Sequence, residues 1–162
     1  MVNLISQELN DLMNKQIVEE LRSGYIYLGM SAWAAGQGLQ GLASFMKTHA
    51  EKEEYKHASK FIHYIIETGG KVELGTIDAV TTDYNDAEEI LKGAIKHEEH
   101  ITNKCKELMD LAQQKKEYYA YDMLNWFIQE QIEEENLFNQ IYDDFLHSNK
   151  SLGVWDHHLK HP

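Results

Sequence analysis

The chain of 162 residues is poor in cysteine, in proline and in long apolar runs. Cys105 stands alone, which excludes an internal disulfide and any CxxC metal module. The single proline leaves room for long, uninterrupted helices. No apolar run reaches the length of a membrane-spanning helix, and the start MVNLISQELNDL lacks the basic and apolar parts of a signal peptide. We therefore expect a cytoplasmic protein in a reducing compartment.

Basic residues are also scarce. The chain has 15 Lys and Arg against 27 Asp and Glu, for a net charge of −12. This balance argues against nucleic acid and anionic membranes as partners. It suits a protein that attracts cations, although the same charge can serve solubility alone. A hydrophobic content of 43% is enough for one globular domain with a sizeable core.

Helical patterns dominate the chain. We expect helices over residues 6–37, 42–68, 85–116 and 119–147. Residues 71–85 have no helical period and are long enough to cross the length of a bundle. Two short connections and one long crossover predict an all-α, up-down-down-up four-helix bundle over residues 1–147. Residues 148–162 would add a short C-terminal segment or fifth helix to the same domain.

Each predicted helix carries metal-binding side chains on the stripe that should face the core. They are Glu20 in the first helix, Glu54 and His57 in the second, Glu98 in the third, and Gln131 and Glu134 in the fourth. A single buried acid or histidine is ordinary in a structural protein. A set of such residues contributed by four helices, each near the middle of its length, is not. Buried carboxylates are costly unless their charge is compensated, and a pair of divalent metal ions compensates several of them. The three-residue spacing of Glu54 and His57 places both groups on one metal ion.

The second helix carries two stripes that are displaced by about one position. The upstream stripe is Leu42, Phe45 or Met46, and His49. The downstream stripe is Glu54, His57, Phe61 and Tyr64. Both cannot face the core in an unbroken α-helix. We therefore predict one inserted residue, accommodated as a π-bulge near Glu51–Glu54, a feature that often occurs at functional sites.

The third helix should begin with a capping-box-like pair, Asn85 and Glu88.

Five stretches resemble the ferritins, and most closely the bacterial non-haem ferritins. They are LNDLMNKQIVEEL, YIYLGMSAW, THAEKEEYKHASKF, KHEEHIT and LNWFIQEQIEEENLF. The similarity covers about residues 8–147, and the EQIEEE run after an aromatic pair is its most specific part. The resemblance implies a ferritin-like bundle with a paired-iron ferroxidase centre. It assigns to that centre Glu20, Glu54, His57, Glu98 and Gln131.

The resemblance also implies roles within the site. Glu20, Glu54 and His57 would bind the first iron ion, and Glu54 would bridge to the second. An acidic third iron site would use Glu53, Glu130, Glu133 and Glu134. Tyr27 and Trp126 correspond to aromatic residues that the family places near the centre, in a packing or a redox role.

The chain departs from the family pattern in two places. One extra residue lies between Ala50 and His57, so an alignment from the left would make Glu53 a ligand and put Lys56 in place of histidine. Lysine is a poor iron ligand at neutral pH, and we therefore align from the right and choose Glu54 and His57. The C-terminal SLGVWDHHL is similar to a trimmed fifth helix. We interpret the histidines of HHLKHP as a solvated tail rather than as metal ligands.

The resemblance implies iron storage in a 24-subunit cage, with ferrous iron and dioxygen or peroxide as substrates. Iron would be the only metal cofactor. Haem is not expected, because Tyr55 stands where haem-binding relatives use methionine, and because Glu130 and Glu133 replace a second Glu-x-x-His motif. Two alternatives remain: a diiron oxidase that scavenges peroxide without storage, and a structural cage protein with a degenerate centre.

Overall fold

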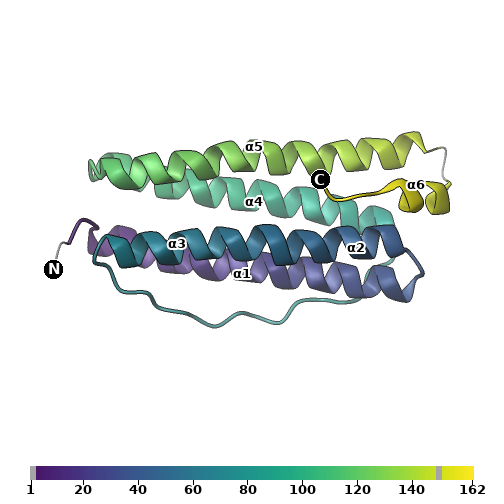
Figure 1. Cartoon of the computed structure of the whole chain (residues 1–162), viewed down its shortest axis with the longest axis horizontal. Coiled ribbons are helices and arrows are strands. Elements are labelled where there is room, and N and C mark those ends of the chain that lie inside the picture. Colours follow the sequence, from purple (N-terminus) through teal and green to yellow (C-terminus); the bar gives the residue numbers. More distant parts are fainter. Residues whose placement is uncertain (1–2, 149–150) are drawn as a thin grey trace.

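The computed structural model describes residues 3–148 and 151–162. Its elements are α1 (Gln7–Gly36), α2 (Gln40–His49), the π-helical η1 (Ala50–Glu54), α3 (Tyr55–Glu67), α4 (Ala87–Gln114), α5 (Tyr118–His147) and α6 (Leu152–His158). Figure 1 shows α2, η1 and α3 as one continuous rod beside α1, with α4 and α5 packed above them. The predicted up-down-down-up bundle with a short C-terminal helix is confirmed. No helix in these ranges is long and apolar enough to cross a membrane.

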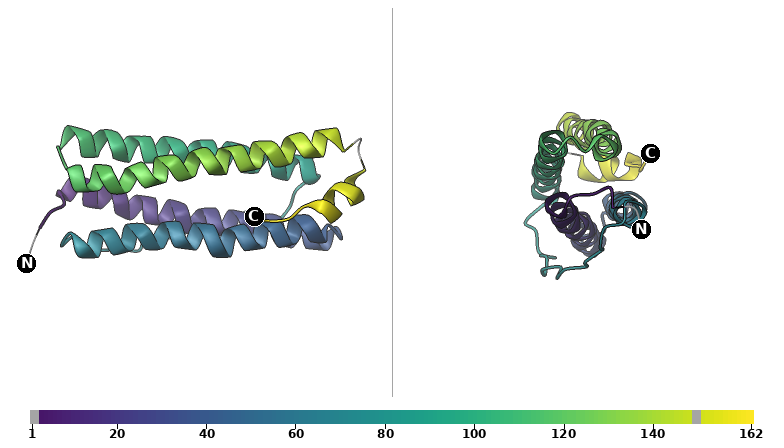
Figure 2. Two further views of the ribbon diagram at one scale, coloured as in Figure 1. Left: turned by 45° about the horizontal axis from the view of Figure 1, so that its top comes forward. Right: turned by 90° about the vertical axis from the view of Figure 1, so that its left-hand side faces the viewer.

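The long crossover runs along the outside of α1 from one end of the bundle to the other (Figures 1 and 2). Asn14 holds its beginning, because its side-chain amide donates to the Lys71 carbonyl at 2.8 Å and its side-chain oxygen accepts from the Glu73 N–H at 2.8 Å. Further along, a Cβ on Gly29 would lie 2.4 Å from the Thr81 carbonyl oxygen. The crossover therefore touches α1 at a point where only glycine leaves room.

The start of α4 differs from the sequence prediction by one residue. Asp86, not Asn85, is the N-cap, and its carboxylate accepts a hydrogen bond from the Glu89 N–H at 2.8 Å. Glu89 reaches back to the Asn85 N–H at 2.6 Å. Glu88 instead pairs with Lys92 at 2.8 Å on the helix surface. The sequence offers two possible N-caps, Asn85 and Asp86, followed by two adjacent acids, Glu88 and Glu89. The direction in which the crossover enters the helix decides which pair forms the cap.

Two apolar clusters fill the bundle on either side of a polar layer at mid-length. One cluster contains Tyr27, Phe45 and Phe138. The other contains Phe61 and Phe127, whose rings stack at 4.2 Å between centroids. Each such side chain contributes about 1.5–3 kcal/mol by full burial. These clusters fix the four rods firmly enough to hold charged groups between them.

The C-terminal helix α6 is anchored on the first turn of α2. The Asp156 carboxylate accepts hydrogen bonds from the N–H groups of Gly41, at 3.0 Å, and Leu42, at 2.8 Å. It thereby caps an end of α2 whose own N-cap, Leu39, has no side-chain acceptor. Trp155 is buried beside it, edge-on to Phe145. The chain then turns back along the bundle and ends near mid-length (Figures 1 and 2).

Gly41→Ala should detach α6 from the bundle. The new methyl group would lie 1.8 Å from the Asp156 carbonyl oxygen, so one of the two helices must move. We expect a loss of about 1–3 kcal/mol in the free energy of unfolding, typical of overpacking, and a red shift of the Trp155 fluorescence. Gly153→Ala is the matched control, since its Cβ would meet no atom within 4 Å. Equal stability of the two variants would contradict this role of Gly41.

Candidate metal centre

The π-helical turn η1 (Ala50–Glu54) confirms the predicted bulge in the second helix. It absorbs one extra residue, so that His49 just before it, Glu54 at its end and His57 after it are all buried. Lys56, by contrast, is exposed. The alignment that chose Glu54 and His57 therefore agrees with the direction in which these side chains point.

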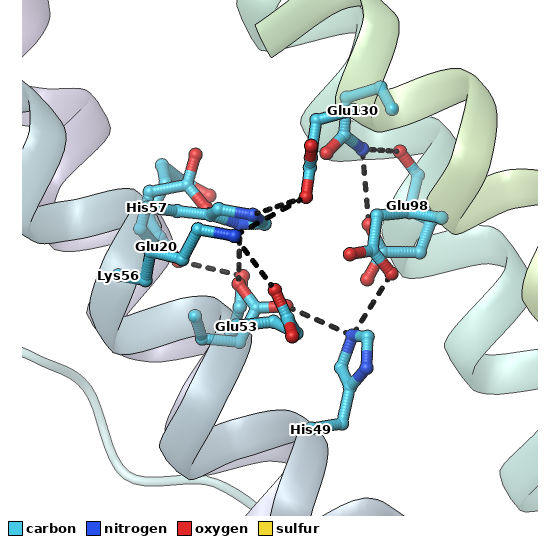
Figure 3. A network of polar contacts seen from close by, with 12 residues as sticks. Glu20, His49, Glu53, Lys56, His57, Glu98 and Glu130 are labelled. Carbon is cyan, nitrogen blue, oxygen red and sulfur yellow. Dashed lines mark hydrogen bonds and ion pairs between the residues drawn. The ribbon is translucent and has the colours of Figure 1, made fainter. Parts of the chain in front are cut away.

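A first group of possible ligands joins α1 to the rod formed by α2, η1 and α3. Atoms of Glu20, Glu54 and His57 lie within 4.8 Å of one another, and all three side chains are buried (Figure 3). The Nδ1 atom of His57 is 3.6 Å from Glu20 and 3.7 Å from Glu54. Gln16 steadies Glu20 by donating to its carboxylate at 2.7 Å. Two carboxylates and an imidazole thus converge with room for an ion between them.

A second group shares Glu54 with the first and adds His49 and Glu98. Figure 3 shows the His49 ring between carboxylates, where its Nε2 atom is 3.3 Å from Glu54 and 3.2 Å from Glu134. The Tyr27 hydroxyl donates to Glu98. Glu54 belongs to both groups, so a single carboxylate joins them.

Gln131 contacts this second group through Glu98. Its amide nitrogen lies 3.1 Å from the Glu98 carboxylate and 3.3 Å from the Thr102 hydroxyl. It is buried, as its place on the α5 stripe predicts. In this arrangement Gln131 orients Glu98.

A third group lies beside the first, nearer the surface. It consists of Glu53, His57, Glu130 and Glu134. The Lys56 ammonium is 3.5 Å from Glu53 and 3.9 Å from Glu130, and so partly neutralises the group. Glu133, expected in the same site, is exposed; it lines the adjoining cavity of about 340 Å³ but joins none of the three groups.

Tyr27 and Trp126 both touch the centre. Tyr27 stacks on Phe138 at 5.5 Å and meets the His49 ring edge-on at 5.0 Å. Trp126 lies edge-on to His57, with the Lys60 ammonium 4.1 Å above its ring. Each aromatic residue therefore holds one histidine of the centre in place.

Burial and mutual repulsion control the protonation of the carboxylates. Burial raises the pKa of Glu98 to about 8, and the charges of Glu54 and Glu134 add to the rise. Burial also raises the pKa of Glu134 to about 7, against the effect of His49. The same burial acts on Glu54, but His49 and His57 outweigh it and lower its pKa to about 2. Without metal, protons and histidines therefore compensate the buried charge.

Two histidines near the centre were not predicted as site residues. His49 was placed on the buried stripe, and its position just before the bulge was the signal that it shares a face with Glu54. His161 was interpreted as part of a solvated tail, and this was wrong: its Nε2 atom lies 3.0 Å from the Nδ1 atom of His49. His157 and His158 are exposed, as that interpretation expected. No periodicity connects residues 112 positions apart, so the pairing had no signal in the sequence.

Comparisons with known proteins agree with this fold. The ferritin family model, a ferritin-like domain, matches residues 10–146. The chain is 37% identical over 140 residues to a probable bacterial non-heme ferritin-like protein of Haemophilus influenzae, covering 86% of this chain and 84% of that protein. It is 32% identical over 148 residues to the bacterial non-heme ferritin of Escherichia coli, covering 91% and 89%. An open pore ferritin from Archaeoglobus fulgidus superposes with a TM-score of 0.93 at 28% identity, covering 96% of each chain.

Glu98→Gln should flatten the pH dependence of stability in metal-free protein. The pKa of Glu98 is about 8 when folded, against about 4.3 in an unfolded chain. Between these values the folded state binds the extra proton, so the free energy of unfolding falls as pH rises, by up to about 1.4 kcal/mol per pH unit. Glutamine cannot ionise and removes this slope.

Denaturant titrations with a chelator present, between pH 5 and pH 8, measure the difference. The matched control is Glu99→Gln, on the exposed side of the same helix turn, which should keep the wild-type slope. Identical slopes in both variants would show that Glu98 does not carry the proton.

Proposed function

The chain belongs to the ferritin family, and we propose that it is an iron-storage ferritin that oxidises Fe(II) at a paired centre within each subunit. The observation that carries the proposal is the sharing of Glu54 between two buried ligand groups, one with Glu20 and His57 and the other with Glu98. Two ions at adjacent positions can each give up one electron. Together they reduce dioxygen to hydrogen peroxide, or peroxide to water.

The ligand chemistry suits iron as the substrate. Carboxylate oxygens with a single imidazole at each ion favour iron or manganese, although zinc competes. Since the carboxylates stabilise a rising metal charge, they favour Fe(III) as the product. Ions entering the centre displace the protons held by Glu98 and Glu134, whose raised pKa values keep them partly protonated near neutral pH. Ion binding should therefore release protons.

The third group supports a route for iron between the centre and the storage space. His57 and Glu134 are buried, whereas Glu53 and Glu130 are half-buried and Glu133 is exposed. Negative charge therefore continues from the paired centre through the cavity to the surface. We propose that this path takes up Fe(III), or delivers Fe(II), while the mineral grows inside a cage of 24 subunits.

Exposed apolar side chains support self-association. Tyr25, Leu28 and Tyr55 are 49%, 42% and 69% exposed, and they surround an apolar cavity of about 320 Å³ between α1 and the rod formed by α2, η1 and α3. Monomeric proteins seldom gather large apolar side chains at one hollow of the surface. A second copy of the chain that covers this face would bury them.

His57→Ala and Glu20→Ala should each slow aerobic Fe(II) oxidation at least about tenfold, because each removes a ligand of the first ion. The growth of amber ferric absorbance measures the rate. His63→Ala is the matched control, since this histidine lies on α3 with its side chain 73% exposed. Oxidation by the wild type no faster than in buffer would indicate a degenerate centre.

The fate of the iron distinguishes a storage ferritin from an enzyme that oxidises iron without storing it. A ferritin leaves a soluble, iron-loaded particle that elutes from size exclusion as a large assembly. A peroxide-scavenging oxidase would turn over and leave the iron in solution or precipitated. Elution as a monomer or dimer would contradict the cage.

A further inference from the structure

We propose that Thr102 and Glu135 are positioning residues of the paired centre, and that they act through the Gln131 amide to fix the orientation of Glu98. The four side chains form one chain of hydrogen bonds between α4 and α5. Glu98 and Thr102 lie one turn apart on α4, and Gln131 and Glu135 lie one turn apart on α5. The inference rests on the proposed function, because the orientation of Glu98 matters only if a second ion binds there.

The direction of each hydrogen bond follows from the hydrogens available. A carboxylate can only accept, so the Thr102 hydroxyl donates its single hydrogen to Glu135. The Thr102 oxygen then offers only lone pairs to its other neighbour, the Gln131 side chain, at 3.3 Å. Gln131 must therefore turn its NH₂ group, and not its carbonyl oxygen, toward Thr102.

The same orientation directs the Gln131 amide at Glu98. The NH₂ nitrogen lies 3.1 Å from the Oε2 atom of Glu98 and 3.3 Å from its backbone oxygen. The Tyr27 hydroxyl donates to the other carboxylate oxygen, Oε1. When Glu98 is ionised, as it must be to bind a metal ion, a donor therefore holds each of its two oxygens. A ligand that is already held in place loses less conformational freedom when the ion arrives.

Glu135 selects between the two possible orientations of the Gln131 amide. Without Glu135, the Thr102 hydroxyl is free to donate to the carbonyl oxygen of a flipped Gln131 side chain. That oxygen would then face the Glu98 carboxylate, and two acceptors in contact repel each other. Glu135 thus acts on Glu98 from outside the ligand groups, and Thr102 transmits its effect.

The bond between Thr102 and Glu135 also ties α4 to α5, and this structural role makes a different prediction. A tie between helices would affect stability and would influence both ion positions alike. A positioning role affects only the second ion. The first ligand group takes Glu20 from α1 and Glu54 and His57 from the rod formed by α2, η1 and α3, so it uses no residue of α4 or α5.

Anaerobic calorimetric titration of the assembled protein with Co²⁺ measures the two ion positions without oxidation. Glu98→Ala identifies the second binding step, because it removes a ligand of the second group alone. Thr102→Val and Glu135→Ala should each raise the second dissociation constant at least about fivefold, approaching the 10–100-fold effect of residues that contact a metal ligand directly. The first dissociation constant should stay the same. Thr102→Ser keeps the hydroxyl and should restore the wild-type second constant.

Asn139→Ala is the matched control. Its exposed side-chain amide donates to the Glu135 backbone carbonyl at 2.7 Å, so the substitution removes a hydrogen bond at Glu135 without touching the carboxylate. Both dissociation constants should remain those of the wild type. If Glu135→Ala does not assemble, the comparison of Thr102→Val with Thr102→Ser decides the question.

Failure of the positioning role and failure of the paired centre give different results. An unchanged second constant in Thr102→Val and Glu135→Ala, or an equal rise of both constants, would show that the bond only ties the helices, and the proposal is wrong. Two binding steps in the wild type would then leave the proposed ferritin function standing. A wild type with no binding step that depends on Glu98 would overturn the paired centre and the positioning role together.

Discussion

Negative charge buried at the middle of the bundle is the constraint on which the rest of the structure depends. Glu20, Glu54 and Glu98 are each at most 2% exposed and come from three different rods. Among the described residues, the imidazoles of His49 and His57, bound protons, and hydrogen bonds from Gln16, Tyr27 and Gln131 compensate this charge. Such an arrangement is stable only where packing above and below it is firm, and the two apolar clusters supply that packing. It also gives the centre a standing affinity for cations.

The π-turn shows how one residue reshapes a site. An unbroken α-helix would turn either His49 or the Glu54–His57 pair away from the core. The bulge keeps both and adds an imidazole to the side of Glu54 that faces Glu134. Because Glu54 is shared by the first and second ligand groups, the bulge also sets how these two groups lie relative to each other. The candidate site thus coincides with a local departure from regular helix geometry, and π-bulges often occur at functional sites.

The C-terminal segment connects the end of the bundle to its centre. Asp156 supplies the cap that α2 lacks, and the residues that follow carry His161 to the end of that helix. Docking of α6 and the contact between His161 and His49 therefore depend on the same short segment of chain. Gly41 is small enough to let α2 and α6 meet.

Helical periodicity was sufficient for the bundle, the crossover, the bulge and the burial of Glu20, Glu54, His57 and Glu98, because each is a local property of which face a residue occupies. Their meeting at one level followed from helix lengths and from the resemblance to a family. Periodicity did not predict three features: the orientation of Gln131 toward Glu98, the position of Glu133 outside the ligand groups, and the contact of His161 with His49. The first two depend on side-chain rotamers, and the third depends on a turn that brings the C-terminal segment back to a residue 112 positions earlier. Only the packed structure decides them.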